Sequence, residues 1–103
     1  MCIRDRKSRV KITVYRKFDC TELPDYSGGC HAFDEGAEFI VETDGKMPQG
    51  FCTWAWNDLY PIIMTLRFGG NFTYCKQEGL MYGCCSDGMS PTVFKLERLA
   101  DEI

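Results

Sequence analysis

Cysteine is the residue type in this sequence that offers the widest range of chemistry. The chain has 103 residues, with seven cysteines and one histidine. Cys30, Cys52 and Cys85 fall where the pattern predicts the end of a loop, the start of a helix and the end of a strand. Because a small fold can bring the ends of several elements together, these three thiols are candidates for one common site.

A common site of this kind would suit a soft metal ion. Three thiolates, together with Cys84 or His31, would complete a tetrahedral zinc site or hold an iron–sulfur cluster. The dipole of the predicted helix would favour the thiolate form of Cys52. However, no two cysteines have the C-x₂-C spacing that pre-organises a pair of ligands. Thiols that pack in the core as small apolar groups, or one redox-active or nucleophilic thiol, are the alternatives.

Other reactive groups have simpler explanations. The adjacent Cys84 and Cys85 could bind one ion together, but alternation along a strand favours one side chain inside and the other outside. Asp34, Glu35 and Asp87 are candidate acids or bases, yet loop and turn positions explain all three. With one histidine, no nucleophile elbow and no phosphate-binding loop, hydrolase and nucleotide-binding functions lack support, and whether the protein is an enzyme stays open.

Residues 50–70 predict the only long helix, which would position Cys52. One face of this helix would be apolar, formed by Ala55, Leu59, Ile62, Ile63 and Leu66. The opposite face would be polar, and it includes Pro61, where a bend rather than a break is expected. Thr53 is the expected N-cap, and Gly69 and Gly70 are the expected terminator.

Aromatic side chains on this helix predict a binding surface. Trp54 and Trp56 are two positions apart, so they are rotated by about 200° and cannot share a face. One of them is expected in the core, and the other, with Tyr60, would form an exposed patch for an oligomer contact or a ligand.

Alternating or β-rich stretches predict four strands, at residues 10–16, 36–42, 80–85 and 92–99. A loop over residues 19–34 follows the first strand and contains Cys20, Cys30 and His31. The order β, loop, β, α, β, β predicts an α+β fold, in which one kinked amphipathic helix covers a small mixed or antiparallel sheet.

Length and composition bound the remaining possibilities. Residues 1–6 resemble translated sequencing-adapter read-through and are expected to lie outside the fold, so residues 7–103 would form a single α+β domain. The net charge of −3, without a basic aromatic run, argues against a nucleic-acid partner. No membrane span or export signal is recognised, and a cytoplasmic location with reduced thiols is therefore expected.

Several motifs, taken in order, resemble an uncharacterised family of small cysteine-containing proteins of about 90 residues, found largely in anaerobic bacteria and archaea. The matching segments are Cys30 with residues 36–39, then residues 45–52, 66–72, 85–87 and 91–98. The resemblance implies cysteines at Cys30, Cys52 and Cys85, whereas Cys20 and Cys75 look lineage-specific.

Three functions are compatible with these patterns. The first is a module that binds zinc or an iron–sulfur cluster and serves as an accessory or electron-transfer protein, with a redox partner in anaerobic metabolism. The second is a self-associating interaction or structural protein with buried thiols. The third is a small enzyme with a reactive cysteine at Cys52 or Cys85.

Overall fold

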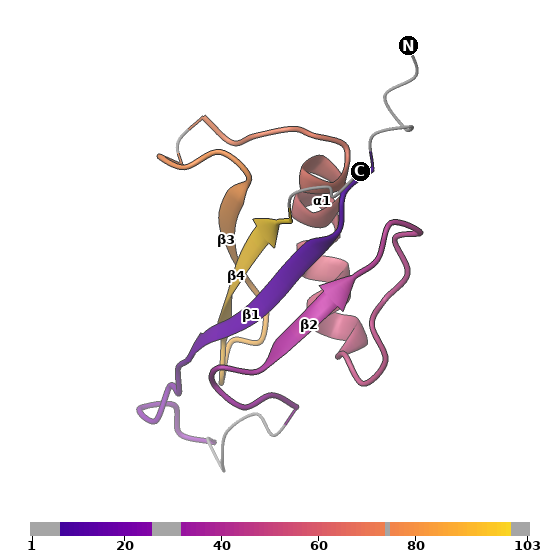
Figure 1. The fold of residues 1–103 in the computed structure, drawn as a ribbon. Coiled ribbons are helices and arrows are strands. Elements are labelled where there is room, and N and C mark those ends of the chain that lie inside the picture. Colours follow the sequence, from indigo (N-terminus) through magenta and orange to yellow (C-terminus); the bar gives the residue numbers. More distant parts are fainter. Residues whose placement is uncertain (1–6, 26–31, 74, 100–103) are drawn as a thin grey trace.

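The computed structural model describes residues 7–25, 32–73 and 75–99. It confirms the α+β class, with a sheet of four strands and one helix packed against it (Figure 1). The elements in chain order are β1 (Val10–Lys17), β2 (Glu38–Val41), α1 (Thr53–Arg67), β3 (Leu80–Cys84) and β4 (Thr92–Arg98). Each strand lies within two residues of its predicted bounds, and α1 lies inside the predicted range of residues 50–70. Residues 1–6, the predicted tail, lie outside the described residues.

The sheet is antiparallel throughout, with strand order β2-β1-β4-β3. The central pair joins the two ends of the described chain, since Val10 of β1 pairs with Arg98 of β4 and Lys17 pairs with Thr92. The register shifts between Val14 and Arg16. Because β2 and β3 are the two edge strands, the segment that contains α1 crosses from one edge of the sheet to the other (Figure 1).

The core forms between the helix and one face of the sheet. Alternate side chains of β1 and β4 point into it, as their sequence period requires: Val10, Ile12, Val14, Thr92, Phe94 and Leu96 are buried. The predicted apolar face of α1 meets them through Ala55, Leu59, Ile63 and Leu66. The helix lies mainly against β3 and β4.

A cluster of phenylalanine rings extends this core beyond the start of the helix. Phe33 contacts the rings of Phe39, Phe51 and Phe94, with centroid distances of 5.8, 5.1 and 5.1 Å. These separations suit edge-on and tilted aromatic packing. Phe33 therefore anchors the segment before β2 to the core beside the N-terminus of α1.

The ends of α1 differ in part from the prediction. Cys52 is the N-cap, and Thr53, the expected cap, is the first helical residue. Pro61 lies inside the helix on its exposed side, as predicted, and the Thr65 hydroxyl donates to the Pro61 carbonyl at 2.8 Å. At the other end Gly69 has φ +86°, the left-handed conformation that ends many helices. Among the described residues, no helix combines the length and apolar character that a bilayer span requires.

Candidate functional site

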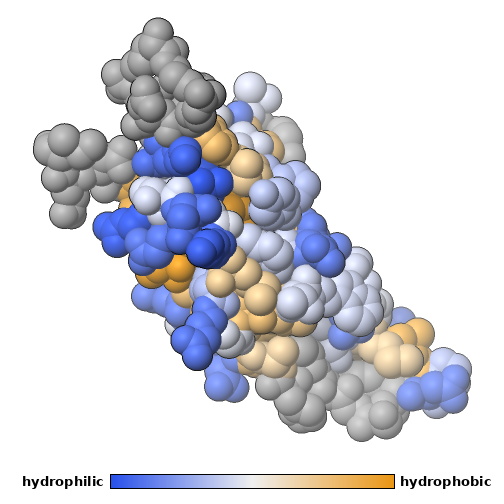
Figure 2. All heavy atoms as spheres, turned by 90° about the vertical axis from the view of Figure 1, so that its right-hand side faces the viewer, coloured by the Kyte–Doolittle hydropathy of each residue, from blue (hydrophilic) through white to orange (hydrophobic). Residues whose placement is uncertain are grey.

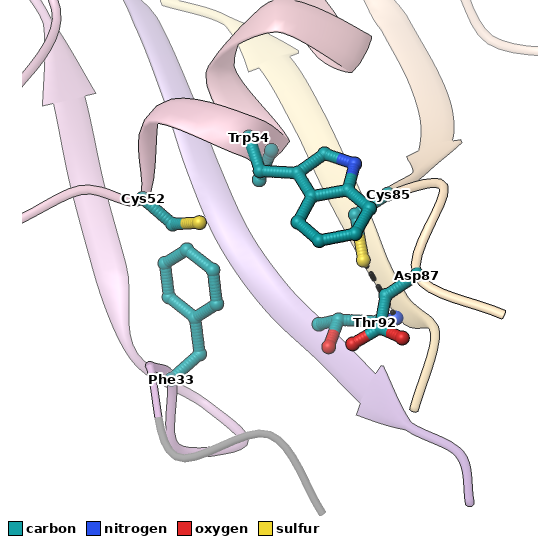
Figure 3. Close-up of a pocket in the computed structure, with 7 residues that line it drawn as sticks. Phe33, Cys52, Trp54, Cys85, Asp87 and Thr92 are labelled. Carbon is teal, nitrogen blue, oxygen red and sulfur yellow. Dashed lines mark hydrogen bonds between the residues drawn. The ribbon is translucent and has the colours of Figure 1, made fainter. Parts of the chain in front are cut away.

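Two of the three predicted ligand cysteines line one pocket. Cys52 and Cys85 are far apart in sequence, yet both border a cavity of about 60 Å³ beside the first turn of α1. The other lining residues are Phe33, Trp54, Ala55, Asp87 and Thr92, so the walls are largely apolar. In Figure 3, Cys52 and Phe33 flank the pocket on one side, and Cys85 and Thr92 on the other.

Cys52 reaches the pocket because it ends the connection before α1. Its neighbour Phe51 is buried in the phenylalanine cluster, and its own carbonyl accepts the N–H of Trp56 at 2.9 Å. The Cys52 side chain makes no capping hydrogen bond to the helix. Its sulfur is therefore free for another role, in the positive field of the first turn.

Replacing Cys52 with serine is expected to raise the free energy of unfolding by about 0.5–1 kcal/mol. A serine at the N-cap accepts a hydrogen bond from the first-turn N–H groups, a contact that the cysteine sulfur lacks. Urea unfolding of metal-free protein measures the gain. A destabilised Cys52→Ser protein would show instead that packing of the sulfur outweighs the missing cap.

Cys85 is held by the strand opposite it. Its N–H donates to the Thr92 carbonyl at 3.1 Å, and its Sγ accepts the Thr92 N–H at 3.3 Å. The hairpin that joins β3 to β4 thus fixes both the backbone and the sulfur of Cys85. A backbone N–H therefore points at the sulfur.

Ser86 ties the start of the helix to this hairpin. Its hydroxyl accepts the indole N–H of Trp54 at 2.6 Å, and its backbone N–H donates to Oδ2 of Asp58 at 2.7 Å. Asp87 stays within the turn, where Oδ1 accepts the N–H groups of Met89 and Ser90. The two walls of the pocket are thus cross-linked by hydrogen bonds.

Cys84 points away from the pocket, as strand alternation predicts. It is exposed, whereas Cys85 packs partly against the core. Its thiol donates to the Cys85 carbonyl at 3.2 Å. Partial burial, followed by the nearby Cys85 and Asp58, raises the pKa of Cys84 above its ordinary value, so this thiol is neutral at pH 7.

The helix aromatics occupy two separate places. Trp54 is 55% exposed, and it both borders the pocket and bonds to Ser86. Trp56 packs against the core, where its ring contacts Phe51 and Tyr60 at centroid distances of 6.2 and 5.7 Å. Tyr60 is 42% exposed. Trp54 and Tyr60 are six positions apart and do not share a helix face. On the side nearest β2, apolar residues form small groups between hydrophilic ones (Figure 2).

The remaining predicted ligands, Cys30 and His31, lie outside the described residues. Within residues 7–25, 32–73 and 75–99, no three histidine, cysteine or acidic side chains converge on one point. The described part of the site therefore offers two thiols.

Thr92 was not among the residues predicted from the sequence. Its signal was present, because an inward-facing residue at the start of the last strand, across a hairpin from Cys85, must lie near that sulfur.

Comparison of the chain with family models, with curated proteins and with solved structures finds no match. The resemblance to the family of small cysteine-containing proteins stays a prediction.

Proposed function

We propose that the protein is a thiolate-based binding module for a soft metal, either zinc or an iron–sulfur cluster. Cys52 and Cys85 would supply two ligands and Cys30 the third. The observation that carries the proposal is that Cys52 and Cys85, from different elements, border one pocket. In this role the protein would serve as an accessory or electron-transfer component for a partner protein.

The surroundings of the two sulfurs suit metal ligands. Cys52 lies at the N-terminus of a helix of 15 residues, where the macrodipole favours negative charge. The Cys85 sulfur already accepts a backbone N–H, a common outer contact of thiolate ligands. Phe33 and Trp54 contribute apolar rings to the pocket wall, and apolar surroundings strengthen charge interactions.

Cys30 is proposed as the third ligand because only a short length of chain separates it from the pocket. It comes three residues before Phe33, which borders the pocket. Three extended residues reach about 10 Å, so the chain is long enough to bring a third sulfur to the other two. Three protein thiolates would leave a fourth metal position for His31 or for a ligand from outside.

Metal analysis after anaerobic purification tests the proposal. Wild-type protein is expected to carry stoichiometric zinc or iron, and a cluster would add visible absorbance. Cys30→Ser, Cys52→Ser and Cys85→Ser should each lose the metal, because each removes a thiolate.

Cys20→Ser and Cys75→Ser are the matched controls, since both cysteines are free and half-buried and neither borders the pocket. These variants should keep the metal. Wild-type protein that stays metal-free after reconstitution with zinc and with iron and sulfide would overturn the proposal.

Self-association is a second candidate, favoured by the exposure of Trp54 and Tyr60. Exposed aromatic side chains are enriched in interfaces between proteins. Sedimentation would show a concentration-dependent dimer that Tyr60→Ala weakens. A monomer at all concentrations would exclude this function.

A further inference from the structure

Thr92 presents a buried polar group without a partner in the described part of the chain. The residue is 0% exposed, and its Oγ1 makes no hydrogen bond there. Buried hydroxyls are nearly always hydrogen-bonded, because an unpaired one loses its hydrogen bonds to water and gains none in the protein. Thr92 borders the thiol pocket. Its unpaired hydroxyl therefore belongs to a residue of the pocket wall.

The sulfur of Cys85 contacts the backbone of this threonine. Its Sγ is 3.3 Å from the backbone nitrogen of the same threonine, and both residues border the pocket. The cavity volume of about 60 Å³ is well below that of cavities which hold benzene, about 150 Å³. The pocket thus combines two thiols and a residue with an unpaired hydroxyl in a space that fits a group of only a few atoms.

We infer that Cys85 is a site of oxidation by small hydroperoxides, with the Thr92 hydroxyl hydrogen-bonded to a peroxide oxygen. This inference goes beyond the proposed metal binding and does not depend on it, since it concerns the metal-free, reduced protein.

The reaction is a two-electron transfer. The Cys85 thiolate attacks one peroxide oxygen, an S–O bond forms and the O–O bond breaks. The other oxygen leaves as hydroxide or alkoxide and takes a proton from solvent, which gives water or an alcohol. Sulfur is oxidised to sulfenic acid, and the peroxide is reduced by the same two electrons. The hydrogen bond from Thr92 would orient the peroxide and stabilise the charge that develops on oxygen.

The adjacent Cys84 provides an internal comparison. It is more exposed than Cys85, so accessibility alone would make it the faster thiol. Yet of these two cysteines only Cys85 borders the pocket that Thr92 also lines. The inference therefore predicts that the less exposed of two adjacent thiols reacts first.

The test is limited oxidation of metal-free, reduced protein with hydrogen peroxide at neutral pH. A sulfenic-acid trap and an alkylating agent then stop the reaction, and mass spectrometry gives the remaining free thiol at each cysteine. Cys85 is expected to be lost at least about tenfold faster than Cys84, Cys20 and Cys75, a ratio comparable to the effect of one well-placed hydrogen bond. Equal rates, or faster loss of Cys84, would overturn the inference.

Thr92→Val removes only the hydroxyl and keeps the backbone N–H that reaches the sulfur. It should slow Cys85 oxidation about tenfold, leave Cys84 unchanged and leave alkylation of Cys85 by iodoacetamide unchanged, since alkylation does not use the peroxide contact. Thr92→Ser restores the hydroxyl and should restore the rate. If valine and serine at this position oxidise at the wild-type rate, Thr92 has no role and the inference fails.

Discussion

Replacing Gly45 with alanine is expected to lower the free energy of unfolding by about 2–4 kcal/mol. Gly45 has φ +75°, a conformation that costs an L-residue about 1–2 kcal/mol. A Cβ there would also lie 2.6 Å from Cζ and Nη1 of Arg67, which is too close. Because Arg67 is only 5% exposed, its guanidinium has little room to move aside.

The contacts of Arg67 explain why this clash is costly. Its Nη2 donates to the Thr43 carbonyl at 2.6 Å, and its Nη1 contacts the Met64 sulfur at 3.2 Å. The guanidinium therefore fastens the turn after β2 to the end of α1. Displacing it would strand a buried cation, which is more expensive than the lost contacts alone.

Gly36→Ala is the matched control for Gly45→Ala. Gly36 has φ +88°, but a Cβ there would meet nothing within 4 Å. This variant should show only the conformational cost, about 1–2 kcal/mol. Urea unfolding of both proteins separates the two contributions. Equal losses would mean that Arg67 moves away freely and does not fasten the turn.

The elements of this fold could be predicted because their signals are local. The apolar face of α1 and the alternation in β1 and β4 follow from periods of 3.6 and 2 residues, which tertiary packing then uses directly. The pairing of β1 with β4 is different, since it joins the two ends of the described chain. No local period specifies which distant strands become neighbours, so the sequence left the strand order open.

The site was predictable only in outline. The expected positions of the thiols at the ends of elements predicted that Cys52 and Cys85 could meet. Both residues border one pocket. Thr92 was missed because its importance depends on hairpin pairing, not on its residue type. Thr53 was preferred as N-cap over Cys52 because threonine caps helices well and cysteine does not. A functional role of the Cys52 thiol would explain why a poor capping residue occupies the N-cap.

Replacing Gly83 with alanine is expected to lower the free energy of unfolding by about 1–3 kcal/mol, because it overfills the contact between β3 and α1. A Cβ at Gly83 would lie 2.5 Å from Cδ2 of Leu59 and 3.0 Å from Cδ1 of Ile62. Leu59 is 0% exposed, so its side chain cannot turn to solvent. The helix would have to move away from the strand. Thermal or urea unfolding measures the loss.

Gly88→Ala, in the same hairpin, is the control, since a Cβ there meets nothing within 4 Å. It should change the stability by less than about 0.5 kcal/mol. If Gly83→Ala also remains as stable as the wild type, the helix does not press on β3 as closely as these distances indicate.

Gly83 also links the packing of the helix to the chemistry of the pocket. Cys52 is carried by α1 and Cys85 follows β3, so any movement of the helix relative to that strand changes the separation of the two thiols. Metal ligands tolerate errors of only about 0.2 Å in their distances. Folded Gly83→Ala protein should therefore bind metal more weakly than Gly88→Ala protein. Both retain every cysteine, so a difference between them would report the spacing of the thiols rather than their number.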